Sequence, residues 1–295
     1  MRHLLLAAAA LALVAAAPPP AKYATPPSVV AESKAGEWQA IPADDLMVID
    51  LNNGQRIVVQ LAPLFAPVHV ANIRALAKSG YWQGAAIYRV QDNYVAQWGN
   101  NDSDKPLPPG VVKKPPAEYH RALAGLKITP LGSPDAYAPA VGYVQGWPVA
   151  YDPKAKTANL PHCYGSVGVG RDLSPDTGMG GELYAAIGHG PRSLDRVIAV
   201  VGRVVSGIDA MSSLPRGTEA LGFYKERTSD VPIANVRLAS MLPEAGRPRF
   251  EYLKETSVSF ARWLKVKKNR RDEFYIRPAG GVDLCNALVP IRPTL

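Results

Sequence analysis

Two apolar runs flank a tight-turn dipeptide at the point where regular patterning begins. Residues 47–51 and 56–61 are rich in Val, Ile and Leu, and Asn53-Gly54 lies between them. Asn-Gly is the strongest short-range signal for a β-hairpin, because a type I′ turn requires positive φ at both central residues. Similar runs recur down the chain and predict a mainly β fold of about seven or eight strands. The other expected strands are 85–90, 94–98, 165–169, 183–187, 197–205 and 231–238.

Two helices are expected among these strands. Val70, Ile73 and Leu76 recur at helical spacing after a proline, and Gly80 ends the pattern. Such a proline start and glycine stop are typical of a short helix. The segment 206–214 predicts a second, shorter helix.

Two regions lack the strand pattern and suggest additions to one domain over residues 41–242. From about 101 to 160 the sequence is dominated by Pro, Gly, Asp and Lys, and only 118–126 looks helical. A loop of this length is unusual inside a compact domain, so we expect an insertion. Residues 243–295 form a C-terminal extension, in which 250–268 has the pattern of an amphipathic helix. We expect this extension to pack on or near the domain, away from any site.

The N-terminus has the pattern of an export signal. Residues 1–3 carry a positive charge, and 4–17 form an unbroken apolar run of fourteen residues. This run is too short to span a bilayer, which takes about twenty residues, but suits a signal peptide. We expect cleavage after Ala16 and a periplasmic protein without a transmembrane segment; an uncleaved membrane anchor is the alternative. Proline-rich residues 17–40 are expected to form an extended tether.

The charge of the chain does not indicate a nucleic acid partner. Its net charge of +8 is spread along the sequence, and no basic run lies on a recognisable nucleic-acid-binding fold, so no nucleic acid partner is expected. One basic cluster lies at the end of the expected C-terminal helix, and either makes a weak contact with an anionic surface or is simply a solvated helix end. Its members are Lys265, Lys267, Lys268, Arg270 and Arg271.

The chain lacks the motifs of metal and cofactor chemistry. Two cysteines, Cys163 and Cys285, exclude an iron–sulfur cluster and a four-cysteine zinc site. In an oxidising compartment they are expected to form a disulfide, with two buried thiols as the alternative. No dinucleotide fingerprint, P-loop or nucleophile elbow occurs, and the histidines are solitary. His162 adjoins Cys163, but neighbours on an extended chain point apart, so no thiolate–imidazole pair is expected. Any catalysis should therefore need no metal, cofactor or covalent nucleophile.

One segment places polar side chains on two expected strands. In 87–100 Arg89 lies between apolar neighbours, and Gln97 follows after a turn on the paired strand. By strand pattern alone, the favoured interpretation of Arg89 is a residue on the barrel rim in a weak ion pair.

The segment resembles the cyclophilin-type peptidyl-prolyl isomerases. That family carries Phe-His-Arg-Val/Ile and then Phe-Met-x-Gln-Gly-Gly-Asp at the same spacing as Tyr88-Arg89 and Tyr94–Gln97 here. Weaker matches keep the family's order over residues 47–238, interrupted by the insertion. They are found at 61–73, 80–82, 165–171, 182–185, 194–195, 200–204 and 207–209.

The resemblance implies a closed eight-stranded β-barrel capped by two helices, and an isomerase of proline-containing polypeptides. The resemblance implies that Arg89 hydrogen-bonds the twisted proline nitrogen of the substrate. It implies that Gln97, the second catalytic residue, binds the backbone of the substrate peptide. The implied substrate-binding residues are Tyr94, Val95, Gly170, Arg171, Glu182, Tyr184, Leu194 and Ile198.

The chain also departs from the family pattern within this site. Tyr88 and Ile198 replace histidines, and Ser193 replaces a tryptophan. Tyr94 and Tyr184 replace phenylalanines, Val95 replaces a methionine, and Glu182 replaces a glutamine. These changes leave three interpretations: an isomerase that assists the folding of exported proteins, a proline-peptide binding module with little catalysis, and a structural protein that docks through its C-terminal segment.

Overall fold

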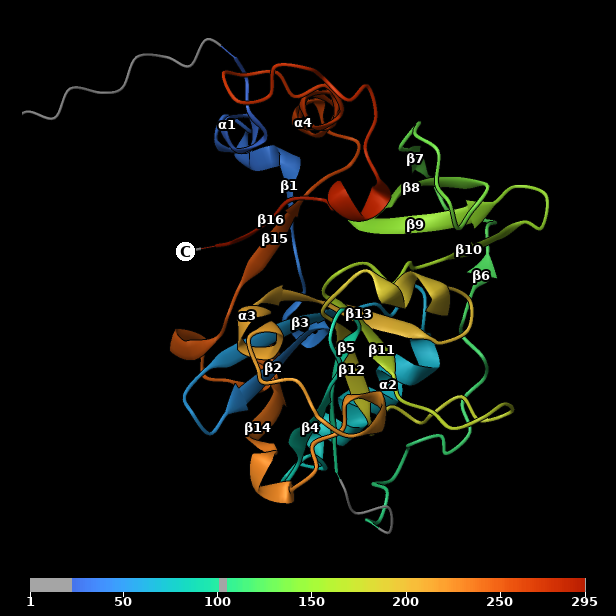
Figure 1. The fold of residues 1–295 in the computed structure, drawn as a ribbon, viewed down its shortest axis with the longest axis vertical. Helices are drawn as coiled ribbons and strands as arrows, with labels where there is room; N and C mark the ends of the chain where they lie inside the picture. Colours follow the sequence, from blue (N-terminus) through green and yellow to red (C-terminus); the bar gives the residue numbers. More distant parts are fainter. Residues whose placement is uncertain (1–22, 101–104, 295) are drawn as a thin grey trace, which may run out of the picture.

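The computed structural model describes residues 23–100 and 105–294, so the expected signal peptide lies outside the described residues. The chain forms a closed β-barrel and a second unit stacked against one end of it; the second unit is uppermost in Figure 1. In the part of the chain that the structure describes, no helix is long and apolar enough to cross a membrane.

The barrel follows the order β11-β12-β5-β4-β14-β2-β3-β13, and every neighbouring pair is antiparallel. The prediction of a mainly β fold with a closed eight-stranded barrel is confirmed. The strands are β2 (Leu46–Leu51), β3 (Arg56–Leu61), β4 (Ala86–Val90), β5 (Val95–Gly99), β11 (Ser166–Val169), β12 (Leu183–Ala186), β13 (Val200–Ser206) and β14 (Val231–Leu238).

The expected first hairpin is present, but its turn differs from the type I′ prediction. Strands β2 and β3 pair with Asp50 opposite Arg56. The turn closes through the Gly54 N–H, which donates to the Leu51 carbonyl at 3.0 Å. Gly54 has a φ of +85°, whereas Asn53 is not among the residues of positive φ. The loop is thus one residue longer than the two-residue turn, with glycine in the left-handed position.

Two helices cover the barrel core, as expected. They are α2 (Pro67–Lys78) and α3 (Asp209–Ser212). Ile73 and Leu76 of α2 and Met211 of α3 are fully buried and pack with the inward side chains of the strands. Their burial closes the barrel interior to water and stabilises the strand framework that carries the site.

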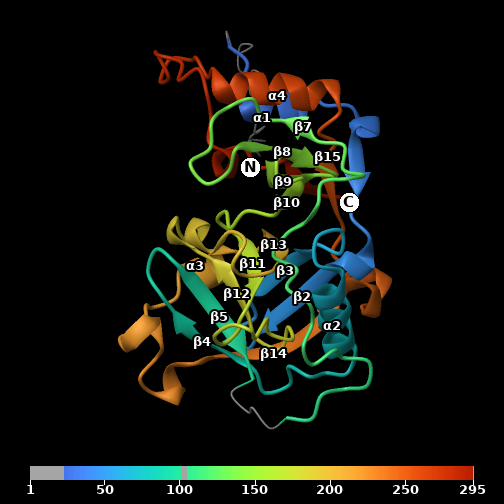
Figure 2. The same ribbon diagram turned by 90° about the vertical axis from the view of Figure 1, so that its right-hand side faces the viewer.

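The second unit is built from three segments that lie far apart in the sequence. Figure 2 shows α4 lying across the top of this unit, above β7 and β8. Its apolar centre joins Val29, Trp38, Tyr143, Phe260 and Leu284. Its elements are α1 (Pro26–Ala31), β1 (Trp38–Ala40), β6 (Arg121–Ala122), β7 (Thr129–Pro130), β8 (Ala140–Val144), β9 (Trp147–Asp152), β10 (Thr157–Asn159), β15 (Phe250–Leu253), α4 (Val258–Lys268) and β16 (Ile291–Pro293).

This unit corrects three expectations about the regions outside the barrel. Residues 26–40 form α1 and β1 rather than an extended tether, and the 101–160 insertion contributes the five strands β6–β10. The helix expected over 250–268 is instead strand β15 followed by α4. In each case isolated apolar residues gain their structure from partners contributed by the other two segments, which local patterning does not reveal.

The helix expected over 118–126 is also absent, and Glu118 explains why. Its carboxylate accepts hydrogen bonds from the backbone N–H groups of Val68 and His69, both at 2.9 Å, and contacts the His69 ring at 2.6 Å. These N–H groups belong to the first turn of α2, where no helical partner exists for them. Glu118 therefore caps the N-terminus of α2, and the insertion continues from it as irregular chain into β6.

Apolar contacts, a buried arginine and a disulfide join the two units. Trp147 and Val149 pack on Phe65 of the barrel side. Arg203 of β13 is buried and donates to the carbonyl of Gly146, in the β8–β9 turn, at 2.8 Å. Because of these contacts the second unit is packed directly on the barrel.

Candidate active site

A cavity of about 710 Å³ opens on the barrel wall where β4, β5 and β12 meet the loops after β11 and α3. Residues from four separate stretches of the sequence meet there. All ten site residues expected from the sequence line it: Arg89, Gln97, Tyr94, Val95, Gly170, Arg171, Glu182, Tyr184, Leu194 and Ile198.

Arg89 lies on β4, opposite Gln97 on β5, just after a register shift in this pair of strands. Its guanidinium donates to the Leu221 carbonyl at 2.7 Å, to Gln97 Oε1 at 2.9 Å and to Gln91 Oε1 at 2.7 Å. All three acceptors are neutral, so these contacts orient the charge without cancelling it. Partial burial lowers the pKa of Arg89, but an arginine keeps its proton at neutral pH. The site therefore presents a fixed cation to the cavity.

Gln97 is held in one orientation by a small hydrogen-bond network. Its Nε2 donates to the Tyr88 hydroxyl at 2.8 Å and to Glu182 Oε2 at 3.0 Å. The Tyr88 hydroxyl donates to the same carboxylate oxygen at 2.5 Å. Burial, together with the Glu182 charge, raises the pKa of Tyr88 well above its ordinary value. Since the amide nitrogen points to Glu182, the amide oxygen faces Arg89 and completes that residue's support.

Aromatic and aliphatic side chains form the apolar part of the cavity. Tyr94 comes from the turn before β5, Val95 from β5 and Tyr184 from β12. Leu194 and Ile198 come from the segment before β13. Val95 and Tyr184 are almost completely buried. Such a surface suits a compact apolar ring, while the polar groups on its other side suit a peptide backbone.

Gly170 and Arg171 follow β11 at the edge of the cavity. The Gly170 N–H donates to the Glu182 carbonyl at 2.9 Å, and a Cβ at this position would lie 3.0 Å from the Glu182 Cβ. Glycine thus allows the two segments to approach. Arg171 donates to the carbonyls of Asp172 and Val197 and does not point its charge freely into the cavity.

Several cavity residues were not among those expected from the sequence. Phe223 stacks on Tyr88 with ring centroids 5.9 Å apart, and its ring lies 5.4 Å from the Arg89 guanidinium carbon. Its loop packs against β4 through an antiparallel bridge between Phe223 and Arg89. A Cβ on Gly222 would lie 2.6 Å from the Cα of Gln91, the residue after β4. No local motif marks this loop as part of the site. Tyr88, noted above as a departure from the family pattern, also lines the cavity. The other unexpected lining residues are Tyr81, Asn100, Asp172, Asp176, Met179, Gly181 and Leu221.

The remaining candidates lie outside the cavity. Cys163 and Cys285 are joined in a disulfide across 122 residues of sequence, linking the entry to β11 with the C-terminal extension. The C-terminal basic residues belong to the second unit, and within it Lys268 donates to the Leu131 carbonyl and Arg270 pairs with Asp272. None of the five lines the cavity. Their weak contact with an anionic surface stays a prediction.

The barrel topology and this cavity define a cyclophilin-like protein. The family model described as "Cyclophilin type peptidyl-prolyl cis-trans isomerase/CLD" matches residues 46–241. The chain therefore belongs to this family and is a peptidyl-prolyl cis–trans isomerase, as the resemblance in its motifs implied.

Known proteins show similarity both in the barrel and beyond it. Proteins of Brucella suis and Brucella abortus named "Probable peptidyl-prolyl cis-trans isomerase" are 26% identical over 181 residues, covering 61% of this chain and 76% of theirs. The crystal structure of cyclophilin AquaCyp293 from Hirschia baltica superposes with a TM-score of 0.67 at 22% identity. It covers 92% of this chain and 98% of its own. The fold it shares thus includes most of the second unit.

Proposed function

We propose that Arg89 accelerates proline isomerisation by hydrogen-bonding the proline nitrogen as the peptide bond twists. The barrier arises because amide resonance is lost on rotation, and an Xaa-Pro bond exchanges over tens to hundreds of seconds unaided. In the twisted state the nitrogen lone pair is no longer conjugated and accepts a hydrogen bond. A donor that binds this state better than the planar one lowers the barrier. The observation that carries the proposal is the Arg89 guanidinium at the cavity, oriented by neutral acceptors only.

The other groups are assigned to binding. The apolar side, with Tyr94, Val95 and Tyr184, holds the proline ring. Gln97 and the backbone at Gly170 hold the peptide on either side of it. No proton transfer is required in this mechanism, so no acid–base pair is needed.

We further propose that the substrates are proteins folding outside the cytoplasm. The apolar run at 4–17 supports export. The disulfide supports an oxidising compartment, because such bonds persist there and are rare in the cytosol. Mass spectrometry of the chain from a periplasmic fraction tests the proposal, and an N-terminus directly after Ala16 is the expected result. A chain recovered with residues 1–16 intact would contradict cleavage.

Arg89→Ala tests the mechanism. Exchange spectroscopy on an Xaa-Pro peptide should show a loss of about 10²–10³ in kcat, as for other preorganised donors. Arg216→Ala is the matched control: this arginine pairs with Asp92 at 3.0 Å and does not line the cavity. It should leave exchange unchanged, and circular dichroism should show both variants folded.

The outcomes separate the interpretations. Peptide binding by the wild type without faster exchange would favour the binding module. Equal exchange rates for wild type and Arg89→Ala would remove Arg89 from the mechanism.

A further inference from the structure

The Tyr184 side chain is locked into the barrel wall beneath the cavity. It lies on β12 directly opposite Gly168 of β11. A Cβ on Gly168 would lie 2.3 Å from the Tyr184 hydroxyl, so the phenol occupies the space that this glycine leaves open. The side chain is nearly inaccessible to water, and a buried hydroxyl is costly without a hydrogen-bond partner.

His162 supplies that partner. Its Nε2 lies 2.9 Å from the Tyr184 hydroxyl, and the two rings are nearly parallel at 15°. On its other side Nδ1 lies 3.1 Å from Asp195 Oδ1, which also accepts from the His162 backbone N–H at 2.8 Å. Because a carboxylate only accepts, Nδ1 carries a proton, and in the neutral imidazole Nε2 then accepts from the hydroxyl. Burial raises the pKa of Tyr184 well above its ordinary value, so the phenol keeps its proton and donates.

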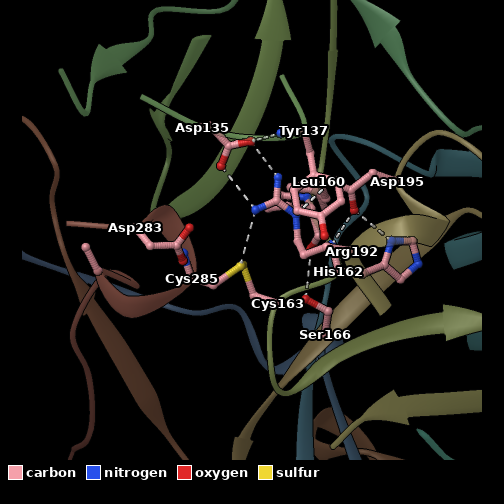
Figure 3. The surroundings of a disulfide bond; sticks show 12 residues. Asp135, Tyr137, Leu160, His162, Cys163, Ser166, Arg192, Asp195, Asp283 and Cys285 are labelled. Atoms are coloured by element: carbon pink, nitrogen blue, oxygen red, sulfur yellow. Dashed lines mark hydrogen bonds and ion pairs between the residues drawn. A yellow bond between two sulfur atoms is a disulfide. The ribbon is translucent and has the colours of Figure 1, made fainter. Parts of the chain in front are cut away.

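The chain of contacts continues into the second unit. Arg192 Nε donates to Asp195 Oδ2 at 2.8 Å, and its other two nitrogens donate to Asp135 at 2.8 and 3.1 Å. Figure 3 shows the Arg192 side chain between the two carboxylates, next to the disulfide that follows His162 in the sequence. Arg192 is shared by Asp195 and Asp135, so each charged side chain of this hydrogen-bond network has an opposite partner. Charges can be buried rigidly only when they are paired in this way.

We propose that His162 is a positioning residue of the proline site, holding the Tyr184 ring in the orientation that receives the proline side chain. The inference rests on the proposed proline-binding role of Tyr184. His162 does not line the cavity, so any effect on the site is indirect. The route proposed is the phenol; the other contact of His162, Asp195, adjoins the lining residue Leu194. The family pattern has a phenylalanine here, so the hydroxyl and its histidine form an added anchor in this chain.

This role predicts an effect on binding rather than on the chemical step. The pocket holds the proline ring in the planar and twisted states alike, so a displaced ring weakens both equally. Loss of such uniform binding raises KM and leaves kcat unchanged. Arg89, in contrast, acts in the twisted state, so its loss should lower kcat. The two proposals therefore have different kinetic signatures.

The experiment compares His162→Leu, His162→Gln, Tyr184→Phe and the double variant Tyr184→Phe/His162→Leu in the full chain. KM and kcat are measured by exchange spectroscopy and peptide Kd by titration. His162→Leu should raise KM and Kd about threefold to tenfold, the value of one hydrogen bond. His162→Gln, whose amide oxygen accepts from the phenol, should restore them to within about twofold. The double variant should match Tyr184→Phe if His162 acts through the phenol, whereas an effect passed through Asp195 to the neighbouring Leu194 would persist in the double variant.

A control separates positioning from general stability. His69→Gln alters another buried histidine with a carboxylate partner, Glu118 at 2.6 Å, and should lower the melting temperature without moving Kd. The proposal is overturned if His162→Leu leaves Kd unchanged, if its effect persists in the Tyr184→Phe background, or if only kcat falls. If His162→Leu does not fold, an unchanged Kd in Tyr184→Phe overturns it. Since Kd needs no turnover, failure of the Arg89 mechanism leaves this test intact.

Discussion

At the residue scale, Glu182 changes the electrostatics of the cavity most directly. The family pattern has a neutral glutamine at this position, whereas here a carboxylate accepts hydrogen bonds from Tyr88 and Gln97. The network keeps the Gln97 amide oriented and at the same time adds a negative charge to the cavity wall that contains Arg89. A glutamine in the same place would keep hydrogen bonds but not the charge.

Glu182→Gln should therefore change which residue is preferred before proline. A charge near the surface is worth about 1 kcal/mol to a neighbouring charge, or about fivefold in rate. We expect the ratio of kcat/KM for a Lys-Pro peptide over a Glu-Pro peptide to fall about 25-fold, about fivefold from each peptide, because the lost charge attracted one and repelled the other. Glu244→Gln, an exposed carboxylate outside the cavity, is the control and should leave the ratio unchanged. An unaltered ratio in Glu182→Gln would show that substrate side chains do not sense this charge.

At the element scale, α4 depends on contacts from the N-terminal segment. Ser257 caps the helix by accepting from the Phe260 N–H at 3.1 Å. Glu37, just before β1, accepts from the Ser259 hydroxyl at 2.7 Å and from its N–H at 2.9 Å. A carboxylate at a helix N-terminus is favourable because it meets unpaired N–H groups and the positive end of the helix dipole. These bonds from Ser259, with one from Lys34, lower the pKa of Glu37 to about 2.

This shift makes the contact sensitive to acid. The folded pKa is below the ordinary value of 4.5, so the contribution of Glu37 is complete above that value and is lost as the pH falls toward about 2. We expect the free energy of unfolding to fall more between about pH 6 and pH 3 in the wild type than in Glu37→Gln. Ser257→Ala, which weakens α4 without removing a titratable group, should retain the wild-type pH dependence. Parallel pH curves for wild type and Glu37→Gln would contradict this assignment.

At the scale of the whole molecule, the two units are held together by a few connections between distant segments. The disulfide closes a loop of 122 residues and lies beside Arg192, which bridges Asp195 of the barrel side and Asp135 of the insertion. Cross-links across long loops restrict the unfolded chain strongly, so this one should contribute to the stability of the two-unit assembly.

Replacing both cysteines tests that contribution. Cys163→Ser/Cys285→Ser should lower the free energy of unfolding by about 2–5 kcal/mol in a denaturant titration without reductant. Reductant should move the wild-type midpoint toward that of the variant and have no effect on the variant itself. Coincident midpoints for wild type and variant would show that the non-covalent contacts alone hold the units together.

The barrel and most of the cavity are predictable from sequence because they depend on local patterns. Alternating apolar runs with turn residues determine strands such as β2 and β3. The spacing of Arg89 and Gln97 on paired strands brings both to one cavity. The stacking of Tyr88 on Phe223 is not predictable in this way. It depends on a loop from far down the chain that packs against β4, and no periodic pattern in the sequence marks that loop.

The second unit is decided by tertiary structure. Val29, Trp38 and Phe260 are too isolated in sequence to predict a core, and they become buried only because three distant segments supply one another's partners. The same holds for the support beneath the cavity. His162 is solitary in the sequence, yet folding places it between the Tyr184 hydroxyl and Asp195. Local periodicity determines which segments form strands, whereas the burial of polar groups and scattered apolar ones depends on contacts across long sequence separations.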